Sequence, residues 1–240
     1  MGALYGHDLA YIQGVGFGDF AEGAAPEIVR VLRSAAIPLR RVIDVGCGAG
    51  PIAAALIDAG FEVTGIDVSA ELLSLARMVC PGARFIHGSI YEQEIPACEA
   101  MVAIGEPLTY HDGEDADARV CDFFRRAHDA LPGGGMLIFD VVELGEPPLS
   151  ARTWRSGGDW AVLVNTSEEQ DSRMLVREIE TFRKVGENYR RGRELHRVRL
   201  FDGAQVCAWL ETEGFSVRTA LGYGEFRLPR RRRAFFCTRR

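Results

Sequence analysis

The stretch VIDVGCGAG, residues 42–50, decides the fold. Val42, Ile43 and Val45 favour a buried β-strand, and the acid Asp44 stands among them. Three glycines follow at every second position, and glycine permits a sharp turn and the close approach of another group to the backbone. The stretch therefore predicts a strand over 41–45 and, after it, a loop that a ligand approaches.

Strand-like and helix-like segments alternate on both sides of this loop. The helical segments carry apolar residues at the i, i+3, i+4, i+7 spacing of a helix that lies on a sheet. Strands separated by such helices indicate a mainly parallel sheet covered on both faces, an α/β fold. Residues 1–22 are rich in aromatics and glycine and have only weak periodicity. The predicted strands are 41–45, 62–67, 84–86, 100–104, 135–141, 215–220 and 233–238, and the predicted helices are 24–35, 51–59, 70–79, 114–131 and 203–213.

The alternation breaks after Val142, where β-rich runs at 159–165, 173–183 and 189–201 replace it. The last two runs flank a plausible hairpin turn at 185–188. A connection of some 60 residues without structure is improbable in a compact domain. We therefore expect a core formed by 1–142 and 203–240, with 143–202 inserted as an antiparallel β lid on the substrate side.

Composition limits the function classes. The chain has 240 residues and a net charge of −6, which argues against a dedicated nucleic-acid binder. The run Arg230–Arg233 is a local exception, interpreted as a solvated flank of the last strand, with a phosphate-binding patch as the alternative. The six cysteines show no paired spacing, and neither a signal peptide nor a membrane span is expected, so the sequence predicts a cytoplasmic protein.

The second ligand signal is Asp67, which ends the next strand, where an acid accepts hydrogen bonds from both hydroxyls of a ribose. Two nucleoside ligands share this geometry. Nicotinamide dinucleotides usually require G-x-G-x-x-G, whereas this loop reads G-x-G-x-G before Pro51. Asp44 would repel a pyrophosphate but suits the ammonium group of a methionine moiety. The sequence therefore favours S-adenosylmethionine over NAD.

These segments together resemble class I S-adenosylmethionine-dependent methyltransferases over nearly the whole chain. VIDVGCGAG is similar to that family's first motif, VTGIDVS (63–69) to its ribose-binding strand end, GARFIHGSIYE (82–92) to its adenine-side loop and LPGGGMLIFDVVE (131–143) to its post-helix strand. The resemblance implies a Rossmann-like, seven-stranded sheet whose last strand, 233–238, is antiparallel.

The resemblance also implies roles for individual residues at the cofactor. Ser89 stands where the family often has Asp, which weakens that one contact. The N-terminal aromatics, Tyr11 among them, are expected to close over the site. By matching position, Gly46 and Gly48 would face the cofactor, Asp44 would order its methionine end, Asp67 would hold the ribose, Val68 would pack on the adenine, Ser89 and Ile90 would flank the adenine edge, and Ile104 and Gly105 would lie by the sulfonium.

The segment after the fourth strand separates the subclasses. Residues 105–110 read GEPLTY and lack the Asn/Asp-Pro-Pro-Tyr-type motif of enzymes that methylate base or glutamine nitrogens. Metal-dependent catechol-type enzymes have an Asp-Asn pair after the fifth strand, where this chain has Asp140-Val141, so no metal site is expected. The inserted sheet resembles, more loosely, the lid of small-molecule N- and O-methyltransferases.

Glu106, Tyr110 and His196 are the candidate catalytic residues, because methyl transfer requires an unprotonated acceptor lone pair. Each has an alternative: Glu106 as a turn cap or a counter-charge to the sulfonium, Tyr110 as lid packing, and His196 as one of a cross-strand pair. We expect His196 to point into the acceptor chamber, while a shift of one residue would bring Arg197 inward instead. Trp154 and Trp160 line a pocket or pack the lid, and packing is favoured for at least one.

The sequence thus predicts a methyltransferase that acts on an N or O of a small molecule, with C left open, and releases S-adenosylhomocysteine. Two alternatives stay open at this point. One is an enzyme that cyclises the aminobutyrate arm of S-adenosylmethionine and releases methylthioadenosine. The other is a non-catalytic cofactor-binding protein. No nucleic-acid or membrane partner is expected, and a homodimer through the lid is left open.

Overall fold

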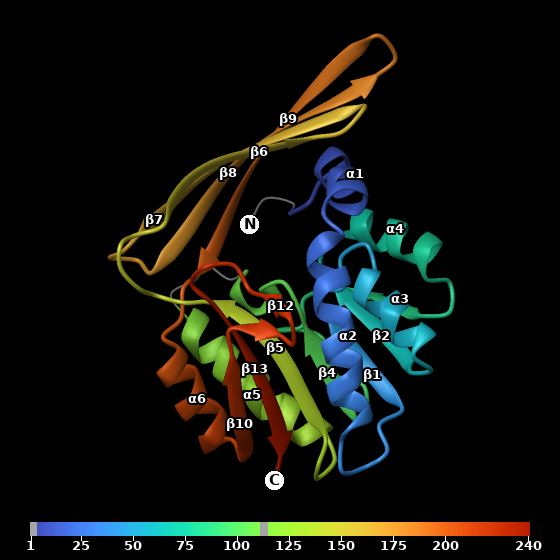
Figure 1. Cartoon of the computed structure of the whole chain (residues 1–240), viewed down its shortest axis with the longest axis vertical. Coiled ribbons are helices and arrows are strands. Elements are labelled where there is room, and N and C mark those ends of the chain that lie inside the picture. Colours follow the sequence, from blue (N-terminus) through green and yellow to red (C-terminus); the bar gives the residue numbers. More distant parts are fainter. Residues whose placement is uncertain (1–3, 111–114) are drawn as a thin grey trace.

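The computed structural model describes residues 4–110 and 115–240, and its core is a seven-stranded sheet (Figure 1). The strand order is β10-β13-β5-β4-β1-β2-β3. Neighbouring strands from β3 to β5 pair in parallel, whereas β13 is antiparallel to both β5 and β10. The prediction of a mainly parallel seven-stranded sheet with an antiparallel last strand is confirmed. The strands are β1 (Arg41–Val45), β2 (Glu62–Asp67), β3 (Arg84–His87), β4 (Ala100–Ala103), β5 (Met136–Val142), β10 (Phe215–Ala220) and β13 (Arg232–Arg239).

Helices cover both faces of this sheet (Figure 1). Because side chains alternate along a strand, each strand contributes to two apolar clusters. Ile43, Leu137 and Phe139 pack with α5 and α6 on one face, and Val42 and Ile138 pack with α2 and α3 on the other. The helices are α1 (His7–Gly16), α2 (Asp19–Arg33), α3 (Pro51–Asp58), α4 (Ala70–Val79), α5 (Ala116–Ala130) and α6 (Gly203–Thr212), with a 3-10 turn η1 at Pro107–Thr109.

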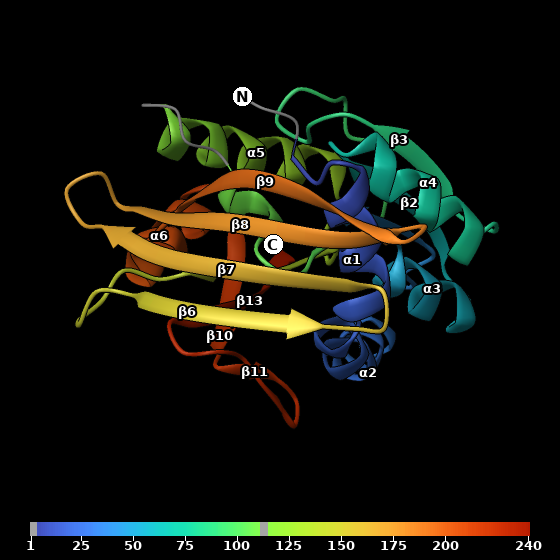
Figure 2. The same cartoon turned by 90° about the horizontal axis from the view of Figure 1, so that it is seen from above.

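A separate four-stranded antiparallel sheet in the order β6-β7-β8-β9 lies over the carboxyl-end edge of the core sheet (Figure 2). We refer to these four strands as the lid. β8 and β9 form the predicted hairpin, in which Val185 pairs with Asn188 across Gly186 and Glu187. The side chains of alternate residues face the core, so one face of the lid is available to cover a ligand. Its strands are β6 (Ser150–Ser156), β7 (Trp160–Glu169), β8 (Met174–Val185) and β9 (Asn188–Arg199).

The structure contains elements that the sequence pattern did not predict. Helix α1 falls in the region of weak periodicity, and α2 starts five residues before its predicted beginning. Gly23 and Pro26 are poor helix formers, so they weaken the helical pattern there. Glycine is nevertheless required at position 23, because the ring of Phe226 occupies the space that a larger side chain would fill. All residues of β6 are exposed, so it has no apolar alternation. β11 (Gly222–Tyr223) and β12 (Phe226–Arg227) are too short for a periodic signal.

The arginine run at the start of β13 is not a solvated flank, and the interpretation as one was wrong. Arg231 pairs with Glu168 at 3.0 Å, Arg232 with Glu106 at 3.0 Å and Arg233 with Glu143 at 2.6 Å. Charge composition alone does not show such partners because they lie far away in the sequence. Glu168 belongs to the lid and Glu143 to the segment that leads into it. The ion pairs of the arginine run therefore fix the lid on the core.

Within the part of the chain that the structure describes, no helix is both long and apolar enough to span a bilayer.

Candidate active site

The glycine loop after β1 is held by the end of β2. The N–H groups of Gly46 and Cys47 donate to the carbonyl of Ile66 at 2.7 and 3.2 Å. The N–H of Gly48 donates to Oδ2 of Asp67 at 2.8 Å. Since β1 and β2 are parallel neighbours, their carboxyl ends meet at one edge of the sheet, where ligands of open α/β folds bind.

Gly46 and Gly48 differ in what surrounds them, although both have positive φ. A side chain at Gly46 (φ 65°) would overlap Pro107, in the loop after β4. A side chain at Gly48 (φ 54°) would meet no atom within 4 Å, and the same holds for Gly105 (φ 87°). Gly46 therefore lets two loops pack together, while Gly48 and Gly105 leave room beside the backbone for a ligand.

Two buried carboxyl groups lie at this loop. Burial, followed by the nearby charge of Asp67, raises the pKa of Asp44 to about 8. One oxygen of Asp44, Oδ2, is buried without a hydrogen-bond partner among the described residues. Burial also raises the pKa of Asp67, against the N–H donors of Ser69 and Gly48 that lower it. An unpartnered buried carboxyl oxygen is costly unless a ligand supplies a donor.

The remaining predicted cofactor residues border one pocket but differ in how deeply they are buried. Val68 is 46% exposed, whereas Ile90 is 6% exposed and belongs to the core. The hydroxyl of Ser89 accepts from the N–H of Tyr91 at 3.3 Å, within its own turn. Ile104 lies at the end of β4, and all four residues border the pocket described next.

One pocket of about 1240 Å³ runs from the glycine loop to the inner face of the lid. This volume exceeds the usual range of single ligand sites, about 300–1,000 Å³, so two ligands fit side by side. The lid contributes Thr153, Val162, Val164, Ile179 and His196 to its lining, among others. The cofactor loops and the lid therefore enclose one continuous space.

Glu106, a predicted catalytic residue, is buried between two arginines. Its Oε1 accepts from Nη1 of Arg177 on β8, and its Oε2 lies 3.0 Å from Nη2 of Arg232 on β13. Burial by itself would raise the pKa of Glu106, but the charges of Arg177 and Arg232 outweigh it, and the pKa lies below its ordinary value. Glu106 therefore stays ionised at neutral pH, and an ion-paired carboxylate is a weak proton acceptor.

Asp140 lies on the far side of Arg232, with Nη1 of Arg232 3.7 Å from Oδ1. Its Oδ2 accepts from the N–H of Gly105 at 2.8 Å and from the hydroxyl of Tyr223 at 2.9 Å. Burial raises its pKa to about 6. Asp140 thus holds the loop after β4 in place. Among residues 4–110 and 115–240, no cluster of metal-binding side chains occurs at Asp140 or elsewhere.

Tyr110 and His196, the other two predicted catalytic residues, lie together with Tyr5 at the lid end of the pocket. The hydroxyls of Tyr5 and Tyr110 are 3.2 Å apart, and Nη1 of Arg177 donates to the hydroxyl of Tyr110 at 3.3 Å. The His196 ring meets the Tyr5 ring edge to face at 4.9 Å between centroids. Burial raises the pKa of both tyrosines, so both hydroxyls keep their protons.

The register of β9 places His196 on the pocket face, where it is 1% exposed. Arg197 faces the other side of the lid and pairs with Glu169 at 2.8 Å. The residue opposite His196 on β8 is Arg177, which the sequence reasoning missed. A single arginine in the charged pattern of β8 carries no signal by itself. Its partner Glu106 is 71 positions away, and only the fold joins them.

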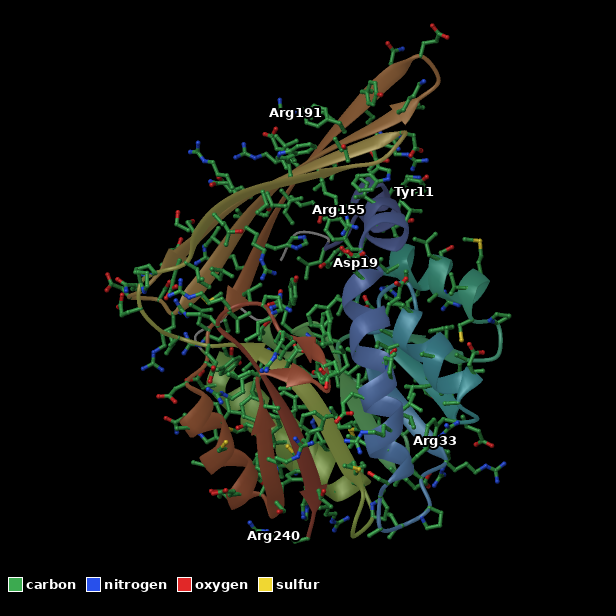
Figure 3. The ribbon with its side chains drawn as sticks, viewed as in Figure 1. Tyr11, Asp19, Arg33, Arg155, Arg191 and Arg240 are labelled. Atoms are coloured by element: carbon green, nitrogen blue, oxygen red, sulfur yellow. The ribbon has the colours of Figure 1, made fainter. Side chains whose placement is uncertain are left out.

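The N-terminal segment connects the lid to the core (Figure 3). The Tyr11 hydroxyl donates to Oδ2 of Asp159 at 3.1 Å, and the guanidinium of Arg183 lies 3.2 Å from the centroid of the Tyr11 ring. Nη2 of Arg155 donates to Oδ1 of Asp19 at 3.1 Å, at the start of α2. Tyr11 lines the pocket but is held by the lid.

The two tryptophans of the lid behave differently. Trp160 is buried and packs with Leu9 and Ile12 of α1, so it fixes the lid on the N-terminal segment. Trp154 is 74% exposed on the outer face and lines no part of the pocket. The expectation that at least one tryptophan packs the lid agrees with this geometry.

Residues 42–135 match the family model described as a methyltransferase domain. A protein of Geobacillus sp. (strain WCH70), named as a methyltransferase, is 26% identical over 194 residues, which cover 74% of each chain. These matches support a class I S-adenosylmethionine-dependent methyltransferase.

The fold of this methyltransferase is also found in solved structures. An S-adenosylmethionine-dependent methyltransferase from Clostridium acetobutylicum superposes with a TM-score of 0.80 at 16% identity, covering 95% of this chain and 96% of that one. The sugar N-methyltransferase KedS8 from Streptoalloteichus sp. gives a TM-score of 0.80 at 20% identity, covering 100% of this chain and 94% of that one. At these identities the two structures show the fold alone.

The residues of the methyltransferase fit its cofactor. The open space beside Gly48 and Gly105 accommodates a ligand against the backbone, and the unpartnered Oδ2 of Asp44 offers an acceptor to a cationic group. Asp67 lies at the end of β2, beside this loop. Carboxyl acceptors beside open space suit the ribose hydroxyls and the ammonium group of S-adenosylmethionine.

Proposed function

We propose that the chain methylates an amine or hydroxyl of a small molecule bound between the core and the lid. The observation that carries the proposal is the single pocket that joins the glycine loop to the buried group of Tyr5, Tyr110 and His196. KedS8, which has the same fold, is a sugar N-methyltransferase, and this favours an amine acceptor. In this proposal residues 1–142 and 203–240 form the cofactor-binding core, and 143–202 form the acceptor side.

S-adenosylmethionine supplies a methyl group whose carbon–sulfur bond electrons return to sulfur when the acceptor lone pair bonds to carbon. The chain positions this donor with backbone and carboxyl groups. In this assignment Gly48 and Gly105 border it, Asp67 accepts from the ribose and Asp44 accepts from the methionine ammonium. Val68, Ser89, Ile90 and Ile104 enclose the adenine and sulfonium, while Gly46 holds the loop in shape.

The acceptor end aligns the second substrate, excludes water and removes one proton. We assign the proton to His196, because this ring lines the pocket and a neutral imidazole has a ring-nitrogen lone pair that can accept a proton. Tyr110 keeps its proton and donates a hydrogen bond to the acceptor. Glu106 remains paired with Arg177 and Arg232 and organises the chamber without taking a proton.

The experiment is incubation of the full chain with S-adenosylmethionine, alone and with a panel of amino sugars and small amines, followed by identification of the nucleoside product. S-adenosylhomocysteine that forms only with an acceptor supports the proposal. Methylthioadenosine formed without acceptor would instead support chemistry on the aminobutyrate arm. Tight NAD binding without S-adenosylmethionine binding in calorimetry would contradict the cofactor assignment.

A matched pair of variants tests the role of the lid residues. His196→Ala is expected to reduce turnover of the acceptor found in the panel about 100-fold, the usual contribution of a general base, with cofactor binding unchanged. Arg197→Ala, which changes the adjacent residue on the outer face, is expected to keep full turnover. Full turnover by both variants would show that the proton is removed elsewhere.

A further inference from the structure

The carboxylate of Glu194, on the inner face of β9, has three hydrogen-bond contacts that meet at the acceptor chamber. Its Oε1 accepts from the N–H of Gly6 at 2.9 Å, and its Oε2 accepts from the N–H of Tyr5 at 2.9 Å. The same Oε2 lies 2.8 Å from Nε2 of His196. An ionised carboxylate has lone pairs and no proton to donate, so the three partners must all be donors.

This requirement fixes the tautomer of His196. Nε2 must carry a proton to donate to Glu194, and in the neutral ring the lone pair that accepts protons is then on Nδ1. Glu194 is the hydrogen-bond partner of the ring among the described residues, and His196 lines the pocket. The groups around the ring are Tyr5, Tyr110, Arg177 opposite on β8 and Glu106.

The two backbone donors come from the segment before α1. The carbonyl of Tyr5 accepts from the Ser69 hydroxyl at 3.0 Å, and Ser69 caps α4 two residues after Asp67. Residues 5 and 6 therefore bridge the lid and the ribose end of the cofactor loops. The carboxylate that orients the histidine is the same one that holds this bridge on the lid.

We propose that Glu194 is a positioning residue that keeps the His196 proton on Nε2 and leaves Nδ1 to take the proton lost by the acceptor. Because the Tyr5 and Gly6 N–H groups share this carboxylate, the histidine is oriented together with closure of the N-terminal segment over the pocket. The inference rests on the proposed function for the acceptor proton, but the orientation itself is a property of the free protein. Glu194 acts through His196 and touches no reacting atom.

The test is two-bond ¹H–¹⁵N correlation of the full chain labelled with ¹⁵N-histidine, without substrate. The chain has five histidines, and the His196 signals are those absent from the His196→Gln variant. The expected result is an Nε2-protonated ring with no second tautomer in the wild type, and averaging between tautomers in Glu194→Gln. A ring protonated on Nδ1 in the wild type would overturn the proposal, whatever the Glu194→Gln variant does.

Hydrogen exchange of the N-terminal segment provides the second readout. Loss of a charged hydrogen bond is expected to speed exchange of the Tyr5 and Gly6 amides about tenfold or more in Glu194→Gln. The control is Glu180→Gln, the same change on the outer face of the lid, where Glu180 pairs with Arg191; it is expected to change neither readout.

The outcomes separate this inference from the proposed function, because neither readout contains an acceptor. A Glu194→Gln variant that keeps both the wild-type tautomer and the wild-type amide exchange would overturn the role of Glu194. With both readouts as expected, full turnover by His196→Ala would instead contradict only the proton transfer assigned under the proposed function.

Discussion

At the cofactor end of the pocket most candidate groups come from one short part of the chain, residues 44–69, with a few from 89–90 and 104–105. At the lid end they come from residues as far apart as Tyr5 and Arg232. The first end consists mainly of backbone N–H groups and two carboxyl groups at the ends of adjacent parallel strands. The second consists of charged and aromatic side chains held by ion pairs between the lid and the core. Local backbone geometry therefore shapes one end, and long-range charge pairing shapes the other.

Substitution of Gly46 is expected to have the largest effect on stability among the changes that test this difference between the two ends. Gly46→Ala places a side chain against Pro107 in a backbone conformation with φ 65°, and strain and overlap together are expected to cost about 3 kcal/mol of unfolding free energy. Urea unfolding measures the loss. Gly48→Ala, in open space, is expected to cost only about 1–2 kcal/mol but to abolish S-adenosylhomocysteine binding in calorimetry. Equal losses of stability would contradict the distinction between the two glycines.

Arg177→Met tests the charge pairing at the lid end. Removal of one partner of a buried ion pair leaves a buried charge, and because Arg232 remains beside Glu106 we expect a loss of about 2–3 kcal/mol, below the usual cost. Thermal and urea unfolding measure it. The control is Arg191→Met on the outer face of the lid, whose exposed pair with Glu180 is expected to contribute less than about 1 kcal/mol. A loss no larger than that of the control would show that Glu106 does not depend on Arg177.

Asp67→Asn tests whether one carboxylate at the cofactor end acts on the ligand as well as on the loop. Loss of charged hydrogen bonds, about 1.5–3 kcal/mol, is expected to weaken S-adenosylmethionine binding at least tenfold. Calorimetry measures the dissociation constant. Asp58→Asn, an exposed change at the end of α3, serves as the control with unchanged affinity. Unchanged affinity in Asp67→Asn would remove this residue from the cofactor site.

The effect that develops most gradually is the pH dependence of stability caused by Asp44. Its pKa is about 8 in the folded protein and near 4 in the unfolded chain, so the folded state holds more protons and stability falls as pH rises through this window. Asp140, with a pKa of about 6, adds the same trend at the lower end. One such group changes stability by at most about 1.4 kcal/mol per pH unit. Between pH 6 and 8 the ligand-free melting temperature is therefore expected to fall by about 5–9 °C, at about 2–4 °C for each kcal/mol. In Asp44→Asn the melting temperature should depend less on pH. The same dependence in the variant and the wild type would contradict a raised pKa of Asp44 in the folded protein.

Much of the core could be read from the sequence because its signals are local. The apolar strand before each turn, the helical spacing in α4 and α5 and the two-residue turn after Val185 place these elements within a few residues of their observed bounds. The fully exposed strand β6 and the helix α1 escaped prediction because tertiary contacts stabilise them. Trp160 packs on α1, and the backbone of β7 pairs with that of β6.

The sequence by itself determined the glycine loop and the carboxyl groups at the ends of β1 and β2. A buried strand that ends in glycines is a local signal for a ligand-binding turn, although the end of β2 holds that turn in place. It also determined that His196 belongs to a strand of alternating character, but not which face that residue would take.

Only the tertiary structure decided the chemistry around that histidine. It brought Glu106 between Arg177 and Arg232, which lowers the pKa of Glu106, and it placed Glu194 against His196 and the N-terminal backbone. Ion pairs and hydrogen bonds depend on distance in space, and residues far apart in the chain come within reach only when the sheet and the lid have folded.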